Sequence, residues 1–160
     1  MYETIYKQTI TKDAPLPFAL PGWIALAPFE EYLGMRIDEA ANGMAILSMP
    51  FCAALCQGMG LMHGGAVTSL ADTALAIAIK TLLPETTHFV TIEMNLKFHA
   101  PVRWGKVKAI AHVTERSDRN IAGAVEVLTE EGIKAATFQA VFRVPRKRSD
   151  LDHKSGVADS

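Results

Sequence analysis

The sequence predicts an α+β fold in which an antiparallel sheet wraps around one long buried helix. Residues 64–82 carry apolar side chains at three- and four-residue spacing, and further isoleucines extend the apolar surface almost all round, as in a buried helix. Four consecutive strand-like runs follow, at residues 89–98, 105–116, 121–129 and 134–144, with alternating apolar and polar side chains. One buried helix followed by consecutive antiparallel strands is typical of an α+β domain.

A hairpin and a loop are expected before the helix. Residues 35–40 and 43–49 have strand character on either side of Asn42-Gly43, a dipeptide that favours a hairpin because both residues tolerate positive φ. Residues 51–62 contain glycines and lack periodicity, so we expect an irregular loop there.

The sequence predicts one domain over residues 28–145, which begins with a short helix after Pro28. Residues 1–27 are interrupted by prolines, and we expect them to form an extension across the surface. Its Phe18 and Trp23 are candidates to close over a pocket. Residues 146–160 are basic at first and then polar, so we expect a disordered tail.

Composition and charge exclude several classes of protein. The chain has 16 basic and 17 acidic residues, a balance that favours neither a nucleic-acid nor a membrane partner. No segment reaches the roughly 18 apolar residues of a membrane span, and the N-terminal residues lack a signal-peptide pattern, so we expect a cytoplasmic protein. Cys52 and Cys56 lack the further ligands of a zinc site, which predicts two reduced thiols and no metal.

The sequence His63-Gly64-Gly65 directly precedes the long helix, and Asp72 lies two turns inside it. The first N–H groups of a helix are unpaired and lie at its positive end, where they can hold a carbonyl oxygen or an anion. A carboxylate in an apolar run is costly unless it has partners or a task. A structural acid in the core is the alternative for Asp72, but the adjacent turn favours catalysis of acyl chemistry.

The spacing of these groups predicts an assembly of two chains. Gly64 and Asp72 are eight residues apart, which is about 12 Å along a helix at ~1.5 Å per residue. A general base or nucleophile must lie within about 3 Å of its target. One substrate carbon therefore cannot contact both groups of one helix, so we expect a homodimer with two equivalent sites at its interface.

Four stretches also carry a family resemblance: residues 29–35, His63-Gly64-Gly65 followed by Asp72, the strand at 90–98, and the turn at 99–105. Together they resemble the hotdog-fold acyl-CoA thioesterases of the PaaI-like and 4-hydroxybenzoyl-CoA thioesterase superfamily. The resemblance implies a hotdog fold, an acyl-CoA substrate hydrolysed to a free acid and CoA, and a homodimer or a dimer of dimers. It implies no cofactor, because coenzyme A is part of the substrate.

The resemblance also implies roles for individual residues. The Gly64 N–H would polarise the thioester carbonyl, and Asp72 of the partner chain would activate a water or attack directly. Thr91 would orient that water, and Gln57, which stands where PaaI-like sequences usually have Asn, would position the carbonyl or the water. The expected catalytic set is Asp72, Gly64, Gly65, Gln57, Thr91 and His63, with His63 shaping the turn rather than acting as a base.

The acyl group and the CoA moiety need contacts of their own. The expected substrate-binding residues are Met59, Met62, Ser69, Lys97, Arg103 and Arg119, of which the basic ones are candidates for the CoA phosphates. Aromatic and short- or medium-chain acyl groups are both compatible with the sequence. A non-catalytic acyl-CoA-binding or sensing protein is an alternative, and so is a hotdog hydratase or dehydratase, although Asp72 lies too deep in the helix for the latter.

Overall fold

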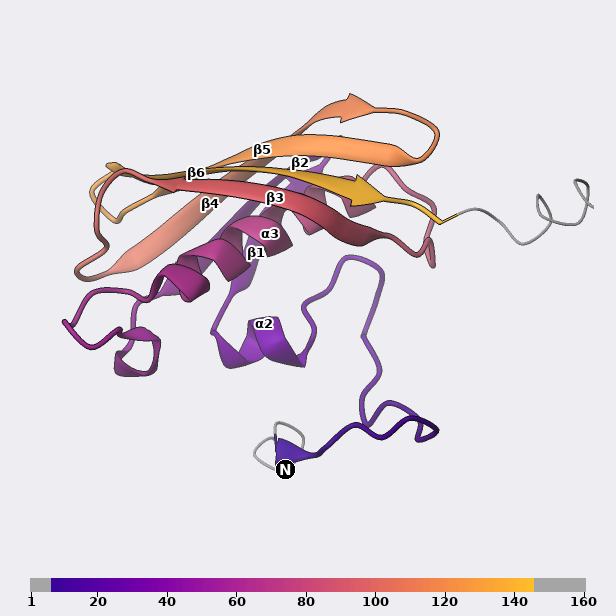
Figure 1. The fold of residues 1–160 in the computed structure, drawn as a ribbon, viewed down its shortest axis with the longest axis horizontal. Coiled ribbons are helices and arrows are strands. Elements are labelled where there is room, and N and C mark those ends of the chain that lie inside the picture. The colour runs from indigo at the N-terminus through magenta and orange to yellow at the C-terminus, as the bar shows by residue number, and fades with distance from the viewer. Residues whose placement is uncertain (1–6, 146–160) are drawn as a thin grey trace, which may run out of the picture.

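The computed structural model describes residues 7–145, so the expected disordered tail at 146–160 lies outside them. Six antiparallel strands form one sheet that curves around a single long helix, α3 (Gly64–Lys80), as Figure 1 shows. The strands are β1 (Arg36–Ala41), β2 (Met44–Pro50), β3 (Val90–Phe98), β4 (Lys106–Arg116), β5 (Asn120–Leu128) and β6 (Lys134–Arg143). The predicted α+β hotdog architecture is confirmed.

The order of strands in the sheet is β1-β2-β4-β5-β6-β3, which places β3 at an edge. We expected four consecutive antiparallel strands, and β4, β5 and β6 do pair in sequence order. The strand β3, however, pairs with β6 and not with β4, because β2 of the first hairpin occupies the free edge of β4. The turn at Pro101 and Gly105 therefore joins two strands that are not neighbours.

The hairpin predicted at Asn42-Gly43 is confirmed. Asn42 and Gly43 have φ values of 51° and 78°, and the flanking residues Ala41 and Met44 pair directly across β1 and β2. Positive φ at both central residues gives the turn the twist that adjacent strands need.

The helix α3 begins and ends close to the predicted positions. His63 is its N-cap, with the ring Nδ1 accepting a hydrogen bond from the Gly65 N–H at 2.8 Å. Thr81 is the C-cap, so the helix ends two residues before the predicted 82. The preceding loop at residues 51–62 contains one 3₁₀ turn, η1 (Ala53–Leu55). The short helix after Pro28 is α2 (Pro28–Tyr32), which lies on the side of α3 away from the sheet (Figure 1).

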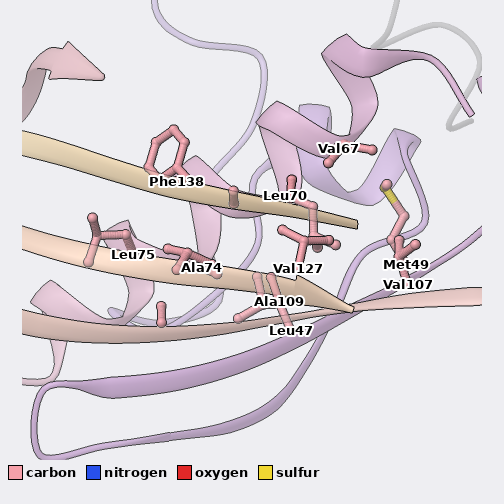
Figure 2. Packing of buried hydrophobic residues seen from close by; sticks show 14 of the residues in the cluster. Leu47, Met49, Val67, Leu70, Ala74, Leu75, Val107, Ala109, Val127 and Phe138 are labelled. Carbon is pink, nitrogen blue, oxygen red and sulfur yellow. The ribbon is translucent and has the colours of Figure 1, made fainter. Parts of the chain in front are cut away.

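The core lies between α3 and the concave face of the sheet. Leu70, Ala74 and Leu75 of the helix have no exposed surface, and they pack against strand residues such as Phe138 and Val127, as Figure 2 shows. The alternation predicted in β4 buries Val107, Ala109 and Ala111. The alanines of α3 let the sheet approach the helix closely, which fixes the helix relative to every strand that it contacts. No helix within residues 7–145 is long and apolar enough to cross a membrane.

Gly123 in β5 marks the closest approach of helix and sheet. A Cβ atom at this position would lie 2.2 Å from Cδ1 of Leu75 and 2.7 Å from the backbone oxygen of His112. Any larger residue there would force apart the helix and the sheet or the two neighbouring strands.

We therefore expect Gly123→Ala to reduce the free energy of unfolding by about 1–3 kcal/mol, as overpacking typically does. Urea denaturation of the purified variant measures this loss. Gly58→Ala is the matched control, because nothing lies within 4 Å of its added Cβ. Equal stability of the two variants would contradict the close approach of α3 to β5.

Candidate functional site

Asp72 lies half-buried on the side of α3 that faces β3. The Thr91 hydroxyl of β3 donates a hydrogen bond to Oδ1 of Asp72 at 3.1 Å. The two residues, which the sequence analysis placed in one catalytic set, are thus brought together from elements 19 residues apart.

An irregularity in β3 explains how Thr91 reaches Asp72. The register against β6 shifts between Thr91 and Glu93, so that Thr91 pairs with Phe142 while Met94 pairs with Ala140. Directly paired residues share a face of the sheet, and Phe142 and Ala140 both belong to the face that contacts the core. The bulge therefore puts Thr91 on the inner face together with Met94, although the two are an odd number of residues apart.

The surroundings of Asp72 change its acidity. Burial raises the pKa of the Asp72 carboxyl above its ordinary value, because the charged form loses hydration. The hydrogen bond from Thr91 acts in the opposite direction, and the negative charge of Glu30 raises the pKa further. A carboxylate with a raised pKa is a stronger base than an ordinary surface Asp.

Asp72 opens into a pocket of about 590 Å³. One wall is the face of α3 from Asp72 to Lys80, and a second is the segment of residues 87–91 that leads into β3. Glu30 of α2 and Trp23 of the N-terminal segment also line it. The sequence analysis missed Glu30 as a neighbour of Asp72, since no spacing along the chain relates residues 42 positions apart.

The N–H groups at the start of α3 are not equivalent. The Gly65 N–H donates to His63 Nδ1, and the Ala66 and Val67 N–H groups donate to the His63 carbonyl oxygen. The Gly64 N–H has no partner among residues 7–145 and lies at the positive end of the helix dipole. Of the two glycines expected to be catalytic, Gly64 therefore has the available donor, whereas the Gly65 N–H is already bonded. His63 shapes the turn, as expected.

Gly64 lines a second pocket, of about 370 Å³, together with Gln57, Met62, Phe98 and Val102. A Cβ atom on Gly64 would lie 3.0 Å from Cζ of Phe98, so a larger residue at this position requires a small shift of the exposed Phe98 ring. The Gln57 side chain is turned back on its loop, where its amide oxygen accepts a hydrogen bond from the Met59 N–H. Its amide nitrogen makes no hydrogen bond within residues 7–145, and a carbonyl oxygen in the pocket would be an acceptor for it.

The two pockets have no lining residue in common among the described residues. Gly64 and Gln57 belong to one, and Asp72 and Thr91 belong to the other. Four of the six residues expected to be catalytic therefore line two separate pockets of a single chain, in keeping with the eight-residue spacing of Gly64 and Asp72.

Of the residues expected to bind substrate, only Met62 lines one of the two pockets. Met62 is buried against the Gly64 pocket, while Met59 is 84% exposed and lies outside both pockets. The Ser69 hydroxyl donates to the Gly65 carbonyl oxygen at 2.8 Å. Lys97, Arg103 and Arg119 are exposed and line neither pocket. A contact between any of these residues and a substrate stays a prediction.

No group of three or more His, Cys, Asp or Glu side chains within residues 7–145 is arranged to hold a metal ion. Cys52 and Cys56 are free and exposed. The polar groups of the two pockets include an amide N–H, an amide side chain, a hydroxyl and a carboxylate, which suit the polarisation of a carbonyl and the activation of a water.

Comparisons with known proteins bear on the family of the chain. A family model described as the thioesterase superfamily matches residues 59–136. The putative esterase ComA2 of Bacillus subtilis is 31% identical over 102 residues, which are 63% of this chain and 81% of that protein. The proofreading thioesterase EntH of Klebsiella pneumoniae is 29% identical over 106 residues, covering 66% of this chain and 77% of that protein.

Solved structures are similar as well. A point mutant of the phenylacetic acid degradation protein PaaI from Thermus thermophilus is 30% identical, with a TM-score of 0.69. The match covers the whole of that chain and 74% of this one. About a quarter of the present chain therefore has no counterpart in that structure.

Two substitutions should move the pKa of Asp72 in opposite directions. Thr91→Val removes the hydrogen bond that stabilises the carboxylate, so the pKa of Asp72 should rise further. Glu30→Gln removes a neighbouring negative charge, so the pKa should fall towards its ordinary value. An NMR titration of the ¹³C-labelled Asp72 carboxyl measures both shifts. Shifts of the same sign in the two variants would contradict the described environment of Asp72.

Proposed function

The chain belongs to the thioesterase superfamily, a family of thioester hydrolases, and from this premise we propose that it hydrolyses acyl-CoA at sites shared between two copies of the chain. The observation that carries the proposal is that the free N–H of Gly64 and the carboxylate of Asp72 lie on one helix but open into separate pockets. Each pocket then needs the other group from a second chain.

The free edge of β3 supports this assembly. It is a nine-residue strand without proline, and its apolar side chains are exposed in the single chain: Val90 58%, Ile92 44%, Met94 47% and Phe98 56%. An exposed, apolar edge strand favours pairing with another strand. Antiparallel pairing of β3 with β3 of a second copy would extend the sheet and bring the two α3 helices together in opposite directions, which would cover Met94 and Phe98 on the inner face.

In such a dimer the Gly64 N–H of one chain faces Asp72 of the other. The thioester carbonyl oxygen accepts a hydrogen bond from Gly64, and the helix dipole stabilises the negative charge that develops there. The Asp72 carboxylate takes a proton from a water whose oxygen bonds to the carbonyl carbon, or it bonds to that carbon itself. In both routes the C–S bond breaks and its electron pair leaves with the CoA thiolate. The water route gives the free acid directly, whereas direct attack gives a mixed anhydride with Asp72 that a water molecule then hydrolyses to the free acid and the carboxylate.

Thr91 and Gln57 fit supporting roles. The Thr91 hydroxyl already holds Asp72 and is placed to orient a water beside it. Gln57 lines the Gly64 pocket, and its free amide nitrogen is a second donor for the carbonyl oxygen. Removal of one such donor typically costs about 3 kcal/mol in the activation barrier.

The proposal also covers the substrate, the location and the assembly of the protein. Lys97, Arg103 and Arg119 are exposed cations that can reach CoA phosphates without burying their charge. The related PaaI is named for phenylacetic acid degradation, which supports an aromatic acyl group, and a short or medium chain is the other class. We also propose a cytoplasmic location, in keeping with the free thiols of Cys52 and Cys56, and pairing of dimers into a tetramer.

Substitution of Asp72 should abolish hydrolysis without unfolding the chain. We expect Asp72→Asn and Asp72→Ala to lower kcat by about 100-fold or more, because a positioned acid–base group contributes at least this factor. Thiol release from benzoyl-, phenylacetyl- and hexanoyl-CoA measures the loss. Asp72→Asn should melt at the same or a higher temperature than the parent chain, since it removes a poorly hydrated charge.

Asp38→Asn is the matched control. Asp38 lies on β1, outside both pockets, and the amide oxygen can still accept from Ser48. Unchanged turnover in Asp72→Ala would reject the proposed catalytic role, and so would an equal loss in Asp38→Asn.

Two inactive variants should restore activity when they are mixed. Gly64→Pro removes the free N–H at the first position of α3, where proline suits the helix, and Asp72→Asn removes the carboxylate. In a mixed dimer, one site receives Gly64 and Asp72 in their native forms, while the other receives both substitutions. Equal mixing after joint refolding should therefore yield about a quarter of the parent activity, since half of the dimers are mixed and each has one native site.

The same mixture also tests the alternative in which each site is formed by a single chain. If Gly64 and Asp72 of a single chain formed one site, every chain in the mixture would be defective and no activity would return. Joint refolding of Asp72→Asn with Asp72→Ala is the control and should remain inactive.

A further inference from the structure

Trp23 of the N-terminal segment is bound to the C-terminal end of α3. Its indole Nε1 donates a hydrogen bond to the Lys80 carbonyl oxygen at 2.9 Å, and the Lys80 ammonium lies 5.1 Å from the ring centroid. The carbonyl groups of the last helical turn have no partner within the helix, so the indole supplies a donor at a position that needs one. The ring orientation of Trp23 is thus fixed by two contacts with one residue.

Trp23 also belongs to a row of aromatic rings. Its ring meets Phe89 edge-on, with centroids 6.5 Å apart at 76°, and Phe89 packs against Phe142 of β6 at 5.8 Å. Such tilted contacts are favourable for aromatic pairs. All three rings line the pocket that contains Asp72.

Asp72 and Trp23 lie at different ends of this pocket. The α3 residues along its wall run from Asp72 through Ala76 and Ile77 to Lys80. Eight residues of helix separate Asp72 from Lys80, which corresponds to about 12 Å. Because Trp23 is bonded to Lys80, its ring closes the end of a groove that begins at the carboxylate.

We propose that this groove receives the acyl group of the substrate and that Trp23 sets the upper limit of acyl length. The inference rests on the proposed thioesterase function, since it assumes that the thioester carbon lies at Asp72. An aromatic or medium-length acyl group extends from Asp72 along Ala76 and Ile77 towards the rings of Phe89 and Trp23. A longer acyl chain meets the fixed indole ring and is excluded.

Phe18, the other aromatic residue of the N-terminal segment with an expected role in closing the pocket, has a different position. It lines a separate pocket against Phe29 of α2 and does not line the Asp72 pocket. The two candidates therefore have different positions: Trp23 closes the groove, whereas Phe18 lies at a separate pocket beside α2.

The first experiment compares kcat/KM for hexanoyl-, phenylacetyl- and palmitoyl-CoA in the full-length chain. Trp23→Ala should increase the ratio of palmitoyl to hexanoyl activity by about tenfold or more, because rejection of extra methylenes in a closed pocket is worth factors of this size. Trp23→Phe should keep the ratio within about threefold of the parent, since a ring still closes the groove without the hydrogen bond to Lys80.

Phe18→Ala is the matched control for loosening of the N-terminal segment, and its acyl-length ratio should equal that of the parent. An unchanged ratio in Trp23→Ala overturns the proposal. A shift in Phe18→Ala as large as that in Trp23→Ala also overturns it, because the effect would then come from the segment as a whole.

The second experiment does not depend on hydrolysis. The chain contains two tryptophans, so Trp104→Phe leaves Trp23 as the single tryptophan, which can be excited selectively over the tyrosines. Phenylacetate and hexanoate, as free acids, should give a saturable change in Trp23 emission, and palmitate a much weaker one. If no thioester is hydrolysed but this change occurs, the proposed function fails and the acyl groove stands. If thioesters are hydrolysed but none of the acids changes the emission, the groove is wrong and the function stands.

Discussion

The burial of α3 in the concave face of the sheet is the constraint on which the other features depend. Leu70, Leu75 and the alanines of the helix that face the sheet are buried, and Gly123 leaves space for nothing larger between helix and strand. Most of the helix surface is therefore occupied by the sheet. The surface that remains includes the stripe from Asp72 to Lys80, and α2, the N-terminal segment and the start of β3 all line the pocket along it.

A helix held in this way is a rigid spacer. It keeps the free N–H of Gly64 and the carboxylate of Asp72 a fixed distance apart, and no rearrangement of side chains can bring the two to one carbon atom. The division of the site between two pockets thus follows from the packing of the core. In the proposed dimer, the stability of the interface and the catalytic geometry depend on the same strand, β3.

Features that depend on local sequence were predictable, whereas features that depend on long-range pairing were not. The hairpin at Asn42-Gly43, the cap at His63 and the half-site spacing follow from residues close in the chain. The strand β3 lies at the edge because β2 pairs with β4, and no local sequence pattern encodes this long-range pairing. Glu30 and Trp23 reach the Asp72 pocket from more than 40 residues away, so only the folded chain brings them there.

Because of the bulge in β3, the Thr91 hydroxyl can be lost from the site in two different ways. A substitution at Thr91 removes a hydroxyl, but the strand stays in register and the loss is confined to one group. If β3 instead paired regularly with β6 through this region, with no bulge and no residue changed, Thr91 would turn to the outer face of the sheet. The position of this hydroxyl therefore depends on the bulge as well as on the residue at position 91.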